Sequence, residues 1–381
     1  MKLSVLLPTR NGGRYLAACI RSILDQRDID LELIVSDNAS TDETSQVLAN
    51  FAGDTRLAVI RQDQALAVTD NWNAALAASS GDWLLMMGDD DLLLDDYGAT
   101  VSQLLAKHPC AECMTFNAYS YVAPGAISSS DGSYYADPHF AGPLLNGAPR
   151  TLGHAERLSI VRDMYRFTPR LPLNMQTTIV SRKAMARVTP PMFRPPFPDH
   201  YALCALLLRA GDWVASPAKP LVIGVTEKSF GHYVYSNDQD AGLSYLGIEL
   251  QFPNQLPGDA LINAMHMWLS RLKVDYPLDL ALTDVSRPDY VLRQVGSWVQ
   301  QRRAGILSTT QLLSLARSLS SDDLRSLARG LARRENLQRI FSHARRLRDG
   351  QALRRWAGLR PLPQVGTISE FARWIGEARV D

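Results

Sequence analysis

The sequence predicts an α/β fold in which helices flank a mostly parallel sheet and a helical appendage follows at the C-terminus. Strand-length apolar runs alternate with segments of helical periodicity up to about residue 253, a pattern typical of parallel sheets with crossover helices. Beyond Asn254 the strand patterns fade and short amphipathic helical patterns take over. We therefore expect one large domain at 1–253 and a helical region at 254–381.

The elements of the N-terminal part follow from their apolar periodicity. Residues 3–7 are apolar except for Ser4, and Leu16, Ile20 and Ile23 then give the following helix one apolar face. The run Ser40-Thr41-Asp42-Glu43 has the spacing of a capping box and predicts the start of a helix that ends near residue 51. The other expected elements of this part are strands at 31–36, 57–61, 83–87 and 110–121 and helices at 70–79 and 97–107.

The remaining elements are predicted with fewer signals. Residues 122–150 are rich in Gly, Pro, Ser and Ala, which indicates a long excursion on the surface, either beside an acceptor or simply solvated. Strands are expected at 177–180 and within 214–224, and helices at 158–167, 201–209, 260–273, 290–302, 310–318, 322–333 and 338–347.

Three consecutive aspartates end the most apolar strand. The strand at 83–87 runs into Gly88 and then into Asp89, Asp90 and Asp91. Three like charges at the carboxyl end of a buried strand repel one another unless a cation neutralises them. Carboxylates without nearby Cys or His suit Mg²⁺ or Mn²⁺, which usually take substrate phosphates as further ligands. A solvated acidic turn or a helix N-terminus is the alternative interpretation.

The loop after the first strand is a candidate anion site. Residues 9–13 connect the carboxyl end of a strand to the N-terminus of a helix, where backbone N–H groups favour negative charge. An ordinary strand-to-helix turn has the same pattern. The loop therefore indicates a nucleotide only in combination with other motifs.

The order of these pieces resembles the nucleotide-binding half of family 2 glycosyltransferases, which have the GT-A (Rossmann-like) fold. The matching segments are 5–11, 33–42, 71–75 and 81–91, and each lies near a strand end. The resemblance implies a nucleotide-binding half at 1–121 and an acceptor half at 122–253. Two departures stand out: Gly88 replaces the first aspartate of the family's Asp-x-Asp-Asp motif, and 70–72 supply no arginine for the diphosphate.

The resemblance also implies roles for individual side chains. Asp37 would accept a hydrogen bond from the nucleotide base, and Asp90 would contact the metal ion with help from its neighbours. Some GT-A enzymes supply a histidine to the metal from the part of the chain that corresponds to 228–233, which makes His232 a candidate ligand. A lone histidine is more often structural. The implied donor-site residues are Pro8, Thr9, Asn11, Asp37, Asn73 and Asp89, and the implied ligands of Mg²⁺ or Mn²⁺ are Asp90, Asp91 and His232.

Asp199 is the candidate catalytic base. It follows Pro198 at the expected start of a helix, where Asp is also a favoured N-cap. In family 2 transferases an acidic residue at the start of a helix in the second half of the domain deprotonates the acceptor, and the segment 198–211 resembles that element. The two roles are compatible.

The C-terminal part is basic. Residues 301–381 contain 16 arginines, no lysine and 7 acidic residues, a charge of +9, so residues 1–300 carry −8 of the total of +1. Arginine-rich amphipathic helices fit either a peripheral contact with an anionic membrane surface or helices packed on the main domain. Four scattered cysteines and the lack of a signal peptide or spanning segment predict a cytoplasmic protein, at the inner face of the membrane if the contact forms.

These observations predict an inverting, metal-dependent glycosyltransferase acting in cell-surface polysaccharide or glycolipid assembly. Its expected partners are a nucleotide-sugar donor and a glycan or lipid-linked acceptor, and we expect no nucleic-acid partner. One alternative is a sugar nucleotidyltransferase, for which the 9–13 loop is too short a phosphate loop. The other is a non-catalytic glycan- or membrane-binding scaffold of the same fold, which would not need the acidic cluster or Asp199.

Overall fold

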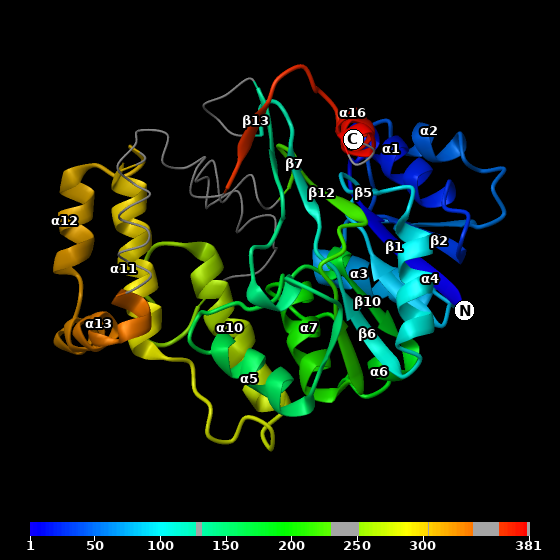
Figure 1. Cartoon of the computed structure of the whole chain (residues 1–381). Coiled ribbons are helices and arrows are strands. Elements are labelled where there is room, and N and C mark those ends of the chain that lie inside the picture. The colour runs from blue at the N-terminus through cyan, green and yellow to red at the C-terminus, as the bar shows by residue number, and fades with distance from the viewer. Residues whose placement is uncertain (127–131, 230–250, 304, 338–357, 379–381) are drawn as a thin grey trace.

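Parallel strands form the centre of the larger sheet. β1 (Lys2–Thr9) lies between β2 (Asp30–Asp37) and β4 (Trp83–Met86) and pairs with both in parallel. Nearly all of their residues are buried, because a parallel sheet is covered on both faces. The computed structural model in Figure 1 describes residues 1–126, 132–229, 251–303, 305–337 and 358–378.

Within the described residues this larger sheet has eight strands in the order β3-β2-β1-β4-β10-β6-β11-β9. β10 runs antiparallel to β4 and β6, β11 is parallel to β6, and β9 is antiparallel at the edge. β4, β6 and β11 therefore point the same way as β1 and β2. The further strands are β3 (Leu57–Arg61), β6 (Ala111–Thr115), β9 (Arg150–Leu152), β10 (Thr178–Ser181) and β11 (Asp212–Ala215).

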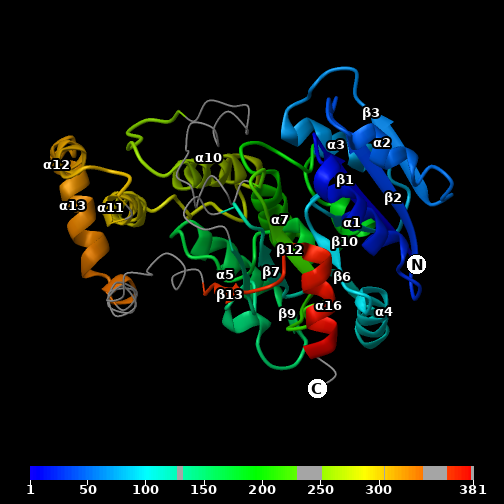
Figure 2. The same ribbon diagram turned by 90° about the horizontal axis from the view of Figure 1, so that it is seen from above.

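Helices cover both faces of this sheet, because alternate strand residues point to opposite sides. Leu3, Val5 and Leu7 share a buried cluster with α1, α2 and α4, whereas Leu6 and Met86 share one with α3, α5, α7 and α10. Figure 2 shows the two layers with the sheet between them. The predicted α/β fold is confirmed. The helices are α1 (Gly13–Leu24), α2 (Thr44–Ala49), α3 (Val68–Ala77), α4 (Tyr97–Lys107), α5 (His154–Met164), α6 (Arg182–Met185), α7 (Pro198–Arg209) and α10 (Ala260–Asp275).

A second sheet completes the main body. Its five described strands have the order β13-β8-β7-β12-β5, and a C-terminal helix, α16, lies against it. Phe371 of α16 is fully buried, and its ring stacks on that of Tyr121 with a centroid distance of 5.5 Å. The elements are β5 (Leu92–Leu93), β7 (Tyr119–Val122), β8 (Ser133–Ala136), β12 (Leu221–Val225), β13 (Arg360–Leu362) and α16 (Ile368–Ala378).

Three helices of the described residues form an appendage at one side of the sheets (Figure 1). They are α11 (Arg287–Arg303), α12 (Thr309–Arg317) and α13 (Ser321–Ala332). Tyr290 and Trp298 of α11 are buried in a small core that also contains Phe167 and Leu256. The appendage is therefore attached to the main body through α11. Two short 3₁₀ helices, 143–145 and 175–177, lie in the connections of the main body.

Several local expectations differ from the structure. The strand expected at 110–121 is two strands, β6 and β7, in different sheets, and the excursion at 122–150 contains the strand β8. The capping box is absent: α2 begins after Glu43, so Ser40 is not its N-cap residue, and the Ser40 hydroxyl accepts the backbone N–H of Asn11. The region after 254 includes the strand β13, and the helix expected at 338–347 lies outside the described residues.

Truncating Phe371 should destabilise the main body. We expect Phe371→Ala to lower the free energy of unfolding by about 3–5 kcal/mol, because a fully buried aromatic ring is replaced by a cavity. Urea denaturation of the full chain measures this. Trp374→Ala is the matched control on the same helix, since Trp374 is half-exposed, and it should cost less than half as much. Equal losses in the two variants would contradict the packing of α16 on the sheet.

Candidate active site

The candidate site lies at the carboxyl edge of the larger sheet. β1, β2 and β4 are parallel, so Thr9, Asp37 and the aspartates after β4 come out at the same edge. α7 precedes β11 after a short turn, and β11 points the same way as β4. The N-terminus of α7, with Asp199, therefore lies at this edge as well. The topology therefore places the residues expected to bind the donor and the expected base at the same edge of the sheet.

Asp91 has a structural role. Its side chain is only 3% exposed, and its two oxygens accept the backbone N–H groups of Gly88 and Gly224 at 2.9 Å each. Burial and the charge of Asp90 raise the pKa of Asp91 well above its usual value. Asp91 therefore joins the two sheets, and we withdraw it from the set of expected metal ligands.

Asp90 is held by the segment that follows β12. One oxygen of its carboxylate accepts hydrogen bonds from the hydroxyl groups of Thr226, at 2.9 Å, and Ser229. The same segment reaches the first loop, where the Lys228 ammonium donates to the carbonyl of Asn11. Burial raises the pKa of Asp90.

Asp89 lies under the first loop. Its Oδ2 accepts the Thr9 hydroxyl at 2.5 Å, and a Cβ at Gly12 would overlap the same oxygen. Burial and the neighbouring charge of Asp90 raise the pKa of Asp89 to about 7. The glycine in this loop is therefore required by the close approach of the loop to the carboxylate.

The donor set fits a hard divalent cation. Asp89 and Asp90 are adjacent, half-buried carboxylates whose ionised forms are destabilised by burial and by each other, and a cation would relieve both effects. Among the described residues no group of three acidic, histidine or cysteine side chains converges on one point. Two protein carboxylates are enough for an ion that takes its other ligands from a diphosphate and water. His232 lies outside the described residues.

Asp37 is buried, which differs from its expected contact with the nucleotide base. It is 1% exposed, its Oδ2 accepts Arg61 Nη1 at 2.6 Å, and its Oδ1 accepts the backbone N–H of Ser40 at 3.0 Å. The Arg61 side chain is half-exposed, so its guanidinium is the accessible group at this strand end. Sequence reasoning missed Arg61. Its signal was its position as the last residue of β3, directly opposite Asp37 in the parallel register.

The first loop is held in one conformation by its own side chains. Asn11 has a left-handed backbone, with φ of 54°, and its Oδ1 accepts the backbone N–H of Thr41 at 2.8 Å. Pro8 is half-buried in β1 opposite Ser36. Asn11 thus shapes the loop that follows Pro8 and Thr9, and the roles of Pro8 and Asn11 at the donor site stay predictions.

Asn73 has a different position from the one expected. Its side-chain amide donates to the carbonyl of Phe193 at 3.0 Å and accepts the backbone N–H of the same residue at 3.3 Å. This pair of bonds fixes the segment before α7 against α3. Asn73 therefore positions the entry to α7, and its amide is engaged by backbone.

Asp199 is in the first turn of α7 but is not its N-cap. Phe197 occupies the cap position and Pro198 follows it, so Asp199 is the second helical residue. Its Oδ1 accepts the backbone N–H of His200 at 2.9 Å, and burial raises the pKa of Asp199 above its usual value. A half-buried carboxyl group with a raised pKa at the sheet edge has the properties of a general base.

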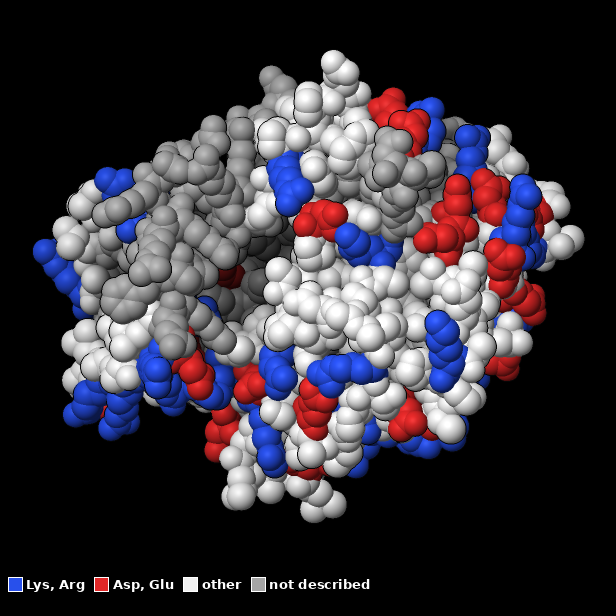
Figure 3. Space-filling model, in the orientation of Figure 1, with Lys and Arg blue, Asp and Glu red and all other residues white. Residues whose placement is uncertain are grey.

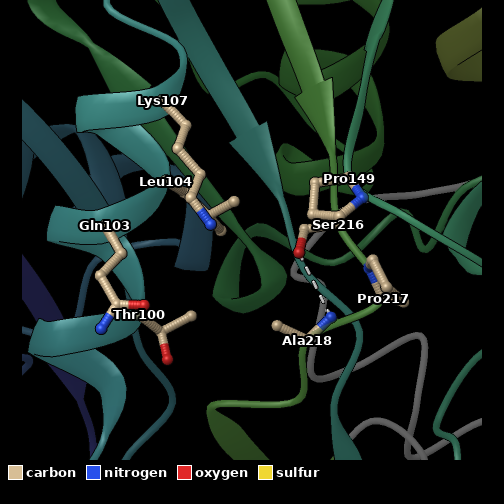
Figure 4. Close-up of a pocket in the computed structure, with 8 residues that line it drawn as sticks. All are labelled: Thr100, Gln103, Leu104, Lys107, Pro149, Ser216, Pro217 and Ala218. Atoms are coloured by element: carbon tan, nitrogen blue, oxygen red, sulfur yellow. Dashed lines mark hydrogen bonds between the residues drawn. The ribbon is translucent and has the colours of Figure 1, made fainter.

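A cavity of about 390 Å³ lies away from these residues (Figure 4). It opens between α4 and the connection after β11, where the Ser216 hydroxyl accepts the backbone N–H of Ala218. None of the predicted site residues lines it. It is therefore separate from the candidate active site. The residues that line it are Thr100, Gln103, Leu104, Lys107, Pro149, Ser216, Pro217 and Ala218.

Comparison with known proteins supports the sequence resemblance. Residues 4–140 match the model of the family "Glycosyl transferase family 2". A PGL/p-HBAD biosynthesis glycosyltransferase of Mycobacterium tuberculosis is 37% identical over 108 residues, which are 28% of this chain and 42% of the relative. A GalNAc(5)-diNAcBac-PP-undecaprenol beta-1,3-glucosyltransferase of Campylobacter jejuni is 38% identical over 104 residues, 27% of this chain and 34% of the relative.

The family model thus matches the N-terminal part, and the chain spans less than half the length of these curated relatives. Among solved structures, TarS 1–349 of S. aureus in complex with UDP-GlcNAc covers 84% of this chain and 91% of its own, with 14% identity and a TM-score of 0.48. The predicted resemblance to family 2 glycosyltransferases is confirmed over residues 4–140, the part that contains Thr9, Asp37 and the acidic cluster.

Replacing Asp91 should damage the fold more than replacing Asp90. Asp91→Asn leaves one of two buried backbone N–H groups without an acceptor, which should lower the free energy of unfolding by about 1–3 kcal/mol. Asp90→Asn can still accept from the two hydroxyl groups and should change stability by less. Urea denaturation without added metal measures both. A larger loss in Asp90→Asn would contradict the structural role of Asp91.

Proposed function

We propose that this protein transfers a sugar from a nucleoside diphosphate sugar to an acceptor hydroxyl, with inversion at the anomeric carbon. The observation that carries the proposal is the convergence of Asp89, Asp90 and the Asp37–Arg61 pair at the ends of adjacent parallel strands, within the segment that matches the glycosyltransferase family. This arrangement offers carboxylates for a cation and a guanidinium for the nucleotide in one place.

In this proposal Asp89 and Asp90 hold Mg²⁺ or Mn²⁺, which supplies positive charge to the diphosphate as it leaves. Thr9 orients Asp89 through its 2.5 Å hydrogen bond, and Asp91 fixes the backbone beneath. Arg61 binds the nucleotide, oriented by Asp37. Two adjacent half-buried carboxylates destabilise the protein in the absence of a cation. A non-catalytic scaffold would have no reason to retain such a pair.

Asp199 acts in this proposal as the general base. It takes the proton of the acceptor hydroxyl as that oxygen attacks the anomeric carbon, on the side of the sugar opposite the leaving diphosphate. Its raised pKa makes it a stronger base than an exposed carboxylate. Asn73 supports this role indirectly, because it fixes the backbone of the segment that enters α7.

For the acceptor we propose a glycan or a lipid-linked glycan of cell-surface polysaccharide or glycolipid assembly, at the inner face of a membrane. The names of two relatives, one in PGL/p-HBAD biosynthesis and one with an undecaprenol-linked substrate, support this class. A lipid-linked acceptor would require a peripheral membrane contact. The basic C-terminal region is the part of the chain whose charge suits that contact.

Metal-dependent donor binding tests the first part of the proposal. In calorimetric titrations with UDP and with GDP, at least one nucleotide should bind more tightly with Mn²⁺ than without it, and Asp90→Asn should abolish this difference because the charge opposing the cation is lost. Asp91→Asn is unsuitable as a control because it is expected to destabilise the fold, so Asp82→Asn, which changes an exposed aspartate at the opposite end of β4, serves instead. Metal-dependent affinity that survives in Asp90→Asn would rule out the assignment.

Turnover should depend on Asp199, and donor binding should not. Asp199→Asn should lower transfer about 10²–10⁴-fold, the usual worth of a general base, with unchanged nucleotide affinity. The parent enzyme should lose kcat/KM as the pH falls through the pKa of Asp199, at a pH above the ordinary aspartate range, and the variant should lack this limb. Asp259→Asn is the matched control, since Asp259 is also half-buried at a helix N-terminus with a raised pKa. Near-normal transfer by Asp199→Asn would leave Asp199 with a structural role alone.

A further inference from the structure

α13 packs in an unusual way for an amphipathic helix. Its buried residues are the small or polar Asp323, Ser326 and Gly330, and a Cβ at Gly330 would come within 2.7 Å of the Pro288 carbonyl oxygen. Asp323 also forms an ion pair with Arg287 of α11. The helix therefore approaches α11 closely through residues that contribute little apolar surface.

Leu327 packs against the small core around α11, but two other leucines of α13 point to solvent. The side chains of Leu324 and Leu331 are 52% and 39% exposed. They are seven residues apart, so they lie on one stripe of the helix with Ala328 between them. The exposed Arg325 and Arg329 lie beside this stripe. We call these five residues the outer face of α13. A leucine stripe bordered by arginines is typical of helices that lie in a membrane interface.

The surroundings of the outer face are basic. Residues 302–337 contain seven arginines and three acidic residues, a net charge of +4. Lys and Arg side chains gather at this end of the molecule in Figure 3, over the part where α11 and α13 lie in Figure 1. Charge of one sign repels a second copy of the same surface and attracts an anionic one.

A second exposed leucine pair shows that exposure alone does not decide the partner. Leu278 and Leu282, between α10 and α11, are 90% and 97% exposed. Residues 274–286, which contain them, include three aspartates and no basic residue. These aspartates pair with Arg271, Arg209 and Lys273, so the surface around the two leucines offers no excess positive charge to an anionic partner, unlike the outer face of α13.

We propose that the outer face of α13 docks on an anionic lipid bilayer, with the helix in the plane of the interface. Leu324 and Leu331 enter the acyl boundary, and Arg325 and Arg329 bind lipid phosphates. No helix in the described parts of the chain is long and apolar enough to cross a membrane. This inference deepens the proposed function by naming the surface that would bring the catalytic domain to a lipid-linked acceptor.

Vesicle binding by the full chain tests the proposal. Sedimentation is measured with vesicles of phosphatidylcholine alone and of phosphatidylcholine mixed with phosphatidylglycerol, without nucleotide sugar. The parent protein should bind only the anionic vesicles, and more weakly at high salt. Leu324→Asn/Leu331→Asn and Arg325→Gln/Arg329→Gln should each lower the partition coefficient by roughly tenfold or more. Thermal melting should stay near that of the parent, because all four side chains are exposed.

The matched control is Leu278→Asn/Leu282→Asn, which removes two more exposed leucines from an acidic segment and should leave binding unchanged. Equal binding of the parent and Leu324→Asn/Leu331→Asn would overturn the proposal. So would a loss of binding confined to the control, or equal binding to both kinds of vesicle. Since no sugar transfer is measured, a protein that binds vesicles but transfers no sugar would contradict the proposed function and leave the docking surface standing.

Discussion

The carboxylate of Asp91 is the interaction on which the rest of the site depends. It accepts one backbone N–H group from the end of β4, at Gly88, and one from β12, at Gly224, and so holds the two sheets together directly below the acidic cluster. Both partners are glycines for a steric reason. A Cβ at Gly88 would come within 2.7 Å of Asp91 Oδ2, and one at Gly224 would overlap the carbonyl oxygen of Asp90. The three consecutive aspartates therefore have different roles, and the role of Asp91 is structural.

This division explains how two negative charges are kept together at the sheet edge. Asp91 fixes the backbone so that Asp90 faces the hydroxyl groups after β12 and Asp89 faces Thr9 on β1. Each carboxylate has a hydrogen-bond donor from a different segment, which limits their mutual approach. The first loop, β4 and the segment after β12 are thus coupled through adjacent side chains, and a ligand that moves one of them acts on the others.

The sequence was sufficient for the features that depend on local pattern. The buried strands, the acidic cluster after β4 and the helices of the appendage follow from apolar periodicity and were predicted close to their observed bounds. Features that depend on contacts between distant segments could not be predicted. The ion pair of Asp37 with Arg61 requires the register of two parallel strands, and the role of Asp91 requires β12, more than a hundred residues later. The predicted capping box does not form, and the Ser40 hydroxyl instead accepts the backbone N–H of Asn11 in the loop after β1.

The pairing of β13 with β8 has a consequence for how the protein is made. The hydroxyl of Ser133 in β8 donates to the carbonyl of Leu362, a contact between residues 229 positions apart. Such a contact can form only after the later partner has left the ribosome, and closing so long a loop is slow relative to local folding. The segment that matches the family can fold its parallel strands early, but the sheet that anchors Asp91 acquires β13 only after residues 360–362 have been made. Until then the nascent chain would expose the aromatic residues of β7 and β8 and would be most open to chaperones and proteases.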